Sequence, residues 1–136
     1  MRRRARHALL VLAALPFLTN CLLISGAQQS SDRAVDAGNV NLQFVSMDGT
    51  EVREVAAADG AASLLVTIFA RVDRGQLRIE VLDPNGSAVI VVEGTAEEQV
   101  ARGTVPTDAV GMLRFRIKAT GAHRGGFQLL YQPADA

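Results

Sequence analysis

The sequence predicts an all-β protein, a single small antiparallel β-sandwich that follows an N-terminal signal helix. Apolar and polar side chains alternate with a period of two in Leu77–Val81 and again in Leu113–Ile117, which is typical of strands with one buried face. Turn residues separate these stretches, most clearly in Asp83-Pro84-Asn85-Gly86. About seven short strands divided by turns indicate a sandwich.

The individual strands follow from the same pattern. Turns are expected at Asp48-Gly49, Asp83–Gly86 and Gly121–Gly126, where glycine permits the backbone to reverse. The apolar run Leu64–Ala70 is expected to be a central strand covered on both faces. The predicted strands are 40–44, 51–56, 64–70, 76–81, 88–92, 99–105, 113–119 and 127–131. The side chains expected to face the core are Leu77, Ile79, Val81, Leu113, Phe115, Ile117, Phe127 and Leu129.

The N-terminus has the pattern of a secretory signal. Met1–Arg6 holds four arginines and no acid, and the apolar run Ala8–Leu18 follows. Because the arginines stay on the cytoplasmic side, the rest of the chain is expected to cross the membrane. We therefore expect an extracytoplasmic protein that is secreted, periplasmic or displayed on the cell surface.

Three interpretations of the signal stay open, of which cleavage after Ala27 is favoured. Ser25-Gly26-Ala27 offers small residues for cleavage after Ala27, which gives a signal peptide of residues 1–27. Leu18-Thr19-Asn20-Cys21 resembles a bacterial lipobox, in which the chain is cut before Cys21 and that cysteine is lipidated. Ala8–Ile24 approaches the length of an uncleaved anchor. Residues 28–39, polar and without periodicity, are expected to be a flexible leader to a sandwich domain of residues 40–132.

Composition weighs against several classes of function. The full chain has equal numbers of acidic and basic residues, so loss of the signal arginines leaves an acidic domain for which nucleic acid is an unsuitable partner. Cys21 is the only cysteine, so the exported domain has no disulfide and no thiol nucleophile. Tryptophan is absent, and no cofactor motif or metal-ligand cluster occurs. No cofactor is expected.

The closing segments resemble a known family. A strand running into a D-P-x-G turn over Gly75–Gly86, and the ending Gly126-Phe127-Gln128-Leu129 within Gly111–Tyr131, are similar to bacterial pre-peptidase C-terminal domains. That resemblance implies a small β-sandwich that accompanies other secreted proteins without catalysing a reaction. Gln76, Arg78 and Glu80 stand where that family tends to carry aspartates, so the resemblance does not extend to a shared calcium site.

One enzyme hypothesis depends on His123, the only histidine outside the signal. A small hydrolase would need His123 beside an acid, Asp83 or Asp108, and a nucleophile such as Ser87. The sequence around Ser87 lacks a nucleophile elbow. An exposed loop histidine is therefore the favoured interpretation, and the hydrolase is kept as the alternative function.

The Asp83 turn also has calcium-like spacing, because Asp83, Asn85 and Ser87 alternate. The glycine of a calcium loop is misplaced and no closing glutamate follows. The pattern therefore indicates a β-turn.

The leading hypothesis is a non-catalytic secreted or envelope module that binds a protein or a surface polymer. Arg114, Arg116 and Lys118 share one face of a strand and form a candidate contact face for an anionic glycan or lipid headgroup. The alternative is a solvated face whose charges pair across strands with acids such as Glu80. The acidic domain favours that alternative.

Overall fold

The computed structural model describes residues 21–34 and 37–134, which form seven strands and no helix. All strand pairs are antiparallel, in the order β1-β3-β7-β4-β5, with β2 on β3 and β6 on β4. No helix of this part could span a membrane. The strands are β1 (Leu23–Ser25), β2 (Gln28–Arg33), β3 (Gly38–Ala56), β4 (Ser63–Leu82), β5 (Ala88–Gly94), β6 (Gln99–Pro106) and β7 (Met112–Pro133).

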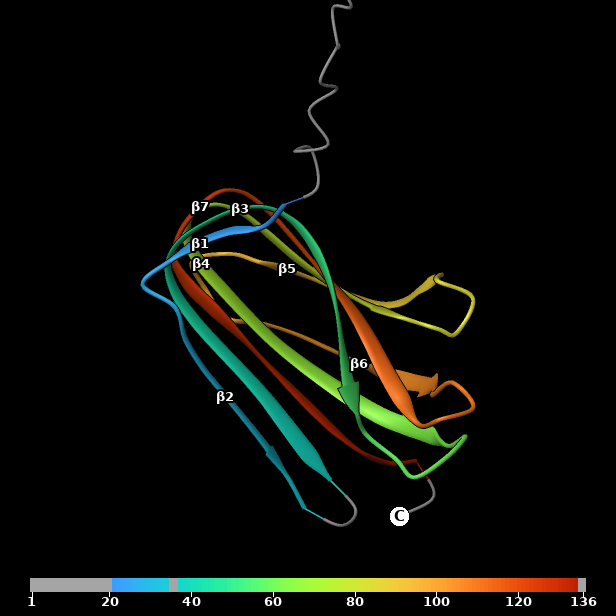
Figure 1. Ribbon diagram of the computed structural model, residues 1–136. Coiled ribbons are helices and arrows are strands. Elements are labelled where there is room, and N and C mark those ends of the chain that lie inside the picture. The colour runs from blue at the N-terminus through green and yellow to red at the C-terminus, as the bar shows by residue number, and fades with distance from the viewer. Residues whose placement is uncertain (1–20, 35–36, 135–136) are drawn as a thin grey trace, which may run out of the picture.

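The long strands β3, β4 and β7 bend over on themselves, so one continuous sheet forms both layers of the sandwich (Figure 1). The pairing register shifts between Met47 and Gly49 and between Arg74 and Gln76, as expected where bulges bend a sheet. The first layer holds residues 38–46, 63–73 and 123–133 with β2 and β6, and the second holds 49–56, 76–82 and 112–119 with β5.

The core lies between the two layers, and the predicted period-two pattern is confirmed there. Phe127 of the first layer meets Phe115 of the second edge to face, with ring centroids 5.9 Å apart. Every predicted core side chain is buried: Leu77, Ile79, Val81, Leu113, Phe115, Ile117, Phe127 and Leu129.

The strand boundaries predicted at three glycines are wrong. The chain does not reverse at Asp48-Gly49, at Gly75 or at Gly121–Gly126, because each is a bend inside a long strand. Gly75 and Gly121 have φ of 79° and 52°, which glycine adopts without steric penalty. The Asp48 carboxylate accepts the Gly121 N–H at 2.8 Å and ties two bends together. His123 therefore lies within β7 and not at a hairpin tip.

The strand Leu64–Ala70 is covered fully on one face only, contrary to the prediction. Its even-numbered residues are buried, whereas Leu65, Thr67 and Phe69 are half-buried on the outer side. This side is where the first layer faces solvent, because no further layer covers it in the described part of the chain. The side chain of Phe69 is therefore partly exposed to solvent.

Residues 23–25 and 28–33 pair with β3, although residues 28–39 were expected to be a flexible leader. β2 runs along Gly38–Gln43 with all six of its side chains exposed, so backbone hydrogen bonds form the strand and no hydrophobic period reveals it. β1 pairs with Ser46–Asp48, and Leu22 and Ile24 pack against the core. Most of the predicted signal, residues 1–20, lies outside the described residues.

We predict that a chain beginning at Gln28 is less stable than one beginning at Cys21. The shorter chain loses β1 and the contacts of Leu22 and Ile24 with the core, which contribute about 1–3 kcal/mol to the free energy of unfolding. Urea unfolding of the two chains measures the difference. Equal midpoints would show that β1 adds nothing to the fold.

We predict that stability falls above the usual tyrosine pKa of about 10. Tyr131 is 3% exposed. Burial raises the pKa of its hydroxyl, and the positive charge of Arg33, which acts to lower that pKa, offsets only part of the effect. Because the folded state holds this proton more tightly, the contribution is complete below the unfolded pKa and is lost as pH rises through the folded pKa. Tyr131 is the only tyrosine and the chain lacks tryptophan, so phenolate absorbance reports its titration directly. A native midpoint no higher than the urea-denatured one contradicts the prediction.

Candidate functional site

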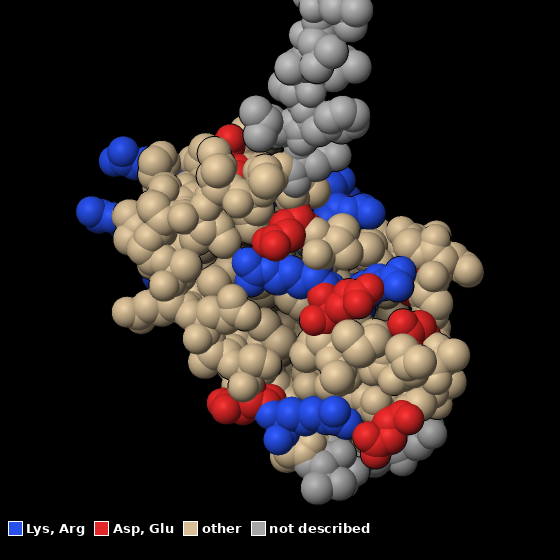
Figure 2. Space-filling model, viewed as in Figure 1, with Lys and Arg blue, Asp and Glu red and all other residues tan. Residues whose placement is uncertain are grey.

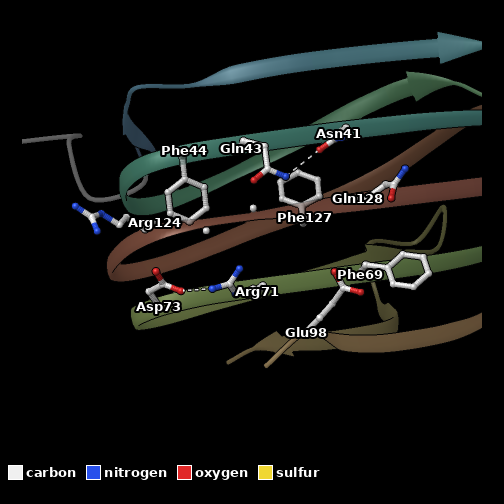
Figure 3. Close-up of a pocket in the computed structure, with 12 residues that line it drawn as sticks. Asn41, Gln43, Phe44, Phe69, Arg71, Asp73, Glu98, Arg124, Phe127 and Gln128 are labelled. Carbon is white, nitrogen blue, oxygen red and sulfur yellow. Dashed lines mark hydrogen bonds and ion pairs between the residues drawn. The ribbon is translucent and has the colours of Figure 1, made fainter. Parts of the chain in front are cut away.

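The outer side of the first layer carries a pocket of ≈ 400 Å³ across β3, β7 and β4 (Figure 3). Amide side chains of β3 and β7 form one part of its lining, and an aromatic ring and charged groups of β4 form the other. The side chains lining it include Asn41, Gln43, Phe69, Arg71, Asp73, Glu98, Arg124 and Gln128. We call this pocket the amide groove.

Strand register brings the groove residues together. Asn41 of β3 lies opposite Gln128 of β7, which in turn lies opposite Phe69 of β4. Directly paired residues on one face of a sheet stand within about 5.5 Å of each other. Two amides and one aromatic ring therefore form a row across three strands that are far apart in the sequence.

The neighbouring row has a gap at its centre. Gln43 and Arg71 flank Gly126, so no side chain fills the space between them. A Cβ at Gly126 would come within 2.5 Å of the Leu42 carbonyl oxygen, so close packing of the strands requires this glycine. Phe44 and Phe127 adjoin the groove, but their side chains are buried in the core on the other side of the sheet.

Hydrogen bonds within the groove orient its polar groups. Gln43 Nε2 donates to Asn41 Oδ1 at 3.3 Å, and Gln128 Nε2 donates to Asn39 Oδ1 at 3.5 Å. Each amide has two N–H donors and a carbonyl oxygen, so these bonds leave capacity for a ligand. Arg71 donates to Asp73 at 2.9 Å and to the Ala96 carbonyl at 3.1 Å, which neutralises its charge.

A second hollow, of ≈ 570 Å³, adjoins the amide groove where the long strands bend. The two share Asp73 and Arg124. We call it the corner hollow. Its lining residues are Val45, Asp73, Arg74, His123 and Arg124.

The structure does not assemble the alternative catalytic site. Within the described residues His123 makes no hydrogen bond or ion pair through its side chain. It pairs across the sheet with Arg74 at the bend, whereas Asp83 and Asp108 lie together near Arg114. Arg114 precedes His123 by nine residues of β7, on the order of 30 Å along an extended strand. Neither acid reaches the histidine.

Asp83 and Asp108 shape turns. The Asp83 carboxylate accepts the N–H groups of Asn85 and Ser87, both at 2.9 Å, and the Asp108 carboxylate accepts those of Val110 and Met112. The Asp83 segment thus forms a turn between β4 and β5. No cluster of three potential metal ligands occurs in the described part of the chain.

The strand face predicted from Arg114, Arg116 and Lys118 lies on the outer side of the second layer, where its charges are paired. Arg114 Nε is 2.6 Å from Glu54 Oε1, and Lys118 Nζ is 3.0 Å from Glu80 Oε1. Arg116 lies 3.5 Å from the other Glu80 oxygen. Acidic and basic side chains are interleaved across the side of the molecule seen in Figure 2. As a contact face this surface remains a hypothesis.

Glu80 is the centre of that network, and we predict that Glu80→Gln lowers stability. The residue is 3% exposed and lies within 3.5 Å of Arg78, Arg116 and Lys118. Loss of its charge leaves three cations close together without a counter-charge. Because the cations are partly solvated, we expect the free energy of unfolding to fall by only about 1–3 kcal/mol.

The matched control for this substitution is Glu93→Gln. The Glu93 side chain is 69% exposed and bonds Arg78 alone, so we expect a change below about 1 kcal/mol. Denaturant unfolding of both variants provides the comparison. Equal losses would argue against a central role for Glu80.

Sequence reasoning missed both hollows. The groove amides occupy outward positions of strands, where polar residues are ordinary, so their type carried no signal. The one local signal was the pair of adjacent glycines, Gly125 and Gly126, which precedes the buried Phe127. Two glycines in a row indicate that neighbouring strands approach closely at this point.

No protein-family model matches the chain, and no curated protein sequence matches it. The proposed resemblance to pre-peptidase C-terminal domains is therefore unsupported beyond the β-sandwich fold. The closing hairpin on which it relied is also wrong, because 113–119 and 127–131 are two halves of β7.

Solved structures similar to this chain include carbohydrate-binding modules. One, from Cellvibrio mixtus lichenase 5A in complex with cellotriose, is 18% identical, with 82% of this chain and 90% of that chain covered and a TM-score of 0.42. The xylan-binding domain of Paenibacillus barcinonensis Xyn10C is 9% identical, with 85% and 86% covered and a TM-score of 0.45. The assignment of the fold depends on the strand pairing described above and not on these low scores.

Proposed function

We propose that this protein is a non-catalytic binding module whose amide groove takes a hydroxyl-rich, uncharged stretch of a polysaccharide. The observation that carries this proposal is the row of Asn41, Gln128 and Phe69 across three strands, beside the gap at Gly126. An amide both donates and accepts hydrogen bonds, as adjacent sugar hydroxyls require. An aromatic ring offers an apolar face to the C–H surface of a sugar.

The charge balance of the groove supports an uncharged ligand segment. The guanidinium of Arg71 already bonds Asp73, and the central row contains no ionisable group. Binding there depends on hydrogen bonds to neutral hydroxyls and on contact of the sugar with the half-buried ring of Phe69.

A polymer suits this groove better than a protein partner. Protein interfaces concentrate large apolar and aromatic residues at their centre, whereas the centre of this pocket consists of amides around a glycine gap. Exposed large apolar residues occur on both layers, Val52 on the second and Val100 and Leu130 on the first, but none of them lines the groove.

We further propose that the domain acts outside the cytoplasm, as the signal pattern of residues 1–27 indicates, and that processing leaves β1 attached. A cut before Cys21, as in a lipoprotein, keeps Leu22 and Ile24 on the core. A cut after Ala27 would remove both. Retention of β1 therefore fits a cut before Cys21 or an uncleaved anchor, and not a cut after Ala27.

We predict that replacing Asn41 and Gln128 together by alanine weakens polysaccharide binding roughly tenfold to a hundredfold. Two lost hydrogen bonds to neutral groups correspond to about 1–3 kcal/mol. Affinity electrophoresis and calorimetry against a β-glucan, a xylan and a mannan, all soluble and uncharged, measure the change.

The control is Gln76→Ala, because Gln76 is an exposed amide of β4 beyond the bend. We expect its binding to equal that of the native chain. The proposal fails if the native protein binds none of the three polymers, or if the groove variant binds as tightly as the control.

A further inference from the structure

The corner hollow brings together two cations that have no acidic partner. Seven described cations pair with carboxylates within 4.0 Å: Arg33, Arg53, Arg71, Arg78, Arg114, Arg116 and Lys118. Among the described residues Arg74, Arg102 and Arg124 have no such partner. Two of these three line the corner hollow.

The one carboxylate in the corner hollow does not neutralise them. Asp73 bonds Arg71 at 2.9 Å, so its charge is already matched. Arg74, Arg124 and the N–H of His123 thus face one hollow with an excess of positive charge and of hydrogen-bond donors.

The backbone holds Arg124 at this place in an unusual conformation. Its φ is 50°, the only positive φ at a non-glycine residue in the described chain. Such conformations are uncommon for side chains of this size and concentrate at functional sites. Arg124 stands at the end of the amide groove beyond Phe44 (Figure 3), so it borders both cavities.

Resting on the proposed function, we propose that the corner hollow binds an anionic substituent of the same polysaccharide, so that the ligand is an acidic polysaccharide. Guanidinium groups bind the paired oxygens of carboxylates and sulfates through two parallel hydrogen bonds. A sugar unit bearing either anion lies at the bend, and the neighbouring units extend along Gln43 and Asn41 in the amide groove. The uncharged centre of the groove and the cationic corner then bind two neighbouring parts of one polysaccharide chain.

Short-range contacts explain this selectivity, since the domain as a whole is acidic. The full sequence has fourteen acidic and fourteen basic residues, and four of the basic residues lie in the predicted signal. Long-range attraction for a polyanion is therefore weak, and the preference arises where Arg74 and Arg124 touch the anion. Salt weakens it, because the hollow is open to solvent.

The test measures binding of the full chain to polygalacturonate and to its fully methyl-esterified form, which has the same backbone without the charge. We expect the native protein to bind the acid at least tenfold more tightly than the ester. A sulfated galactan in a parallel arm separates carboxylate from sulfate as the preferred anion.

The variant for this test is Arg74→Gln/Arg124→Asn, in which asparagine tolerates the positive φ. We expect it to bind acid and ester equally, at the affinity of the native protein for the ester. The matched control, Arg102→Gln, removes the unpaired cation outside the corner hollow and is expected to retain the preference. Unchanged urea midpoints show that both variants are folded.

Equal binding of acid and ester by the native protein overturns this inference while leaving the proposed groove intact. A preference that survives in the double variant also overturns it. Binding to vesicles of anionic phospholipid, with none to either polymer, contradicts both this inference and the proposed function. Loss of ester binding in Asn41→Ala/Gln128→Ala, with the acid preference of the remaining binding retained, supports separate roles for groove and corner.

Discussion

The bend shared by the three long strands is the constraint on which the rest of the molecule depends. Gly75 and Gly121 let β4 and β7 turn at a register shift, on both sides of which the two strands stay paired. The Asp48 carboxylate fastens β3 to β7 at the same level. Because the strands continue through the bend, the two layers are halves of one sheet (Figure 1). The core, the groove and the corner hollow all follow from where that sheet folds.

Much of the fold could be predicted from the sequence. A strand that is buried on one face has apolar residues at every second position, whatever the order in which the strands pair. Leu77, Ile79 and Phe115 were placed in the core for this reason and are buried. The continuity of the strands could not be predicted. A glycine flanked by polar residues marks a hairpin and a bend alike, and only the pairing partners distinguish them. The candidate site depends on register between distant strands, which no local pattern at Asn41 or Gln128 records.

The two outer faces of the sandwich differ in how their charges are satisfied. On the second layer a nearly buried Glu80 lies within 3.5 Å of Arg78, Arg116 and Lys118, so the charges of these side chains are paired within the protein. On the first layer the amides Asn41, Gln43 and Gln128 have spare donors and acceptors. Two of the three arginines without a carboxylate partner, Arg74 and Arg124, lie at its bent end. A surface that has satisfied its own charges gains little from a ligand, whereas unpaired donors that are held in place gain more.

The N-terminal strands connect the proposed processing of the chain to the proposed binding surface. β3 carries Asn41 and Gln43, and its outer edge would present unpaired backbone groups if β2 were absent. Ser30 and Gln28 of β2 lie directly opposite those two residues, so the backbone of the groove wall is hydrogen-bonded on both sides. β1 continues the same edge to the bend, where the Ser25 hydroxyl bonds that of Ser46. A mature chain that keeps both strands therefore holds the wall of the groove rigid from its centre to the corner, which is the preorganisation that a shallow polar site needs to bind a flexible polymer.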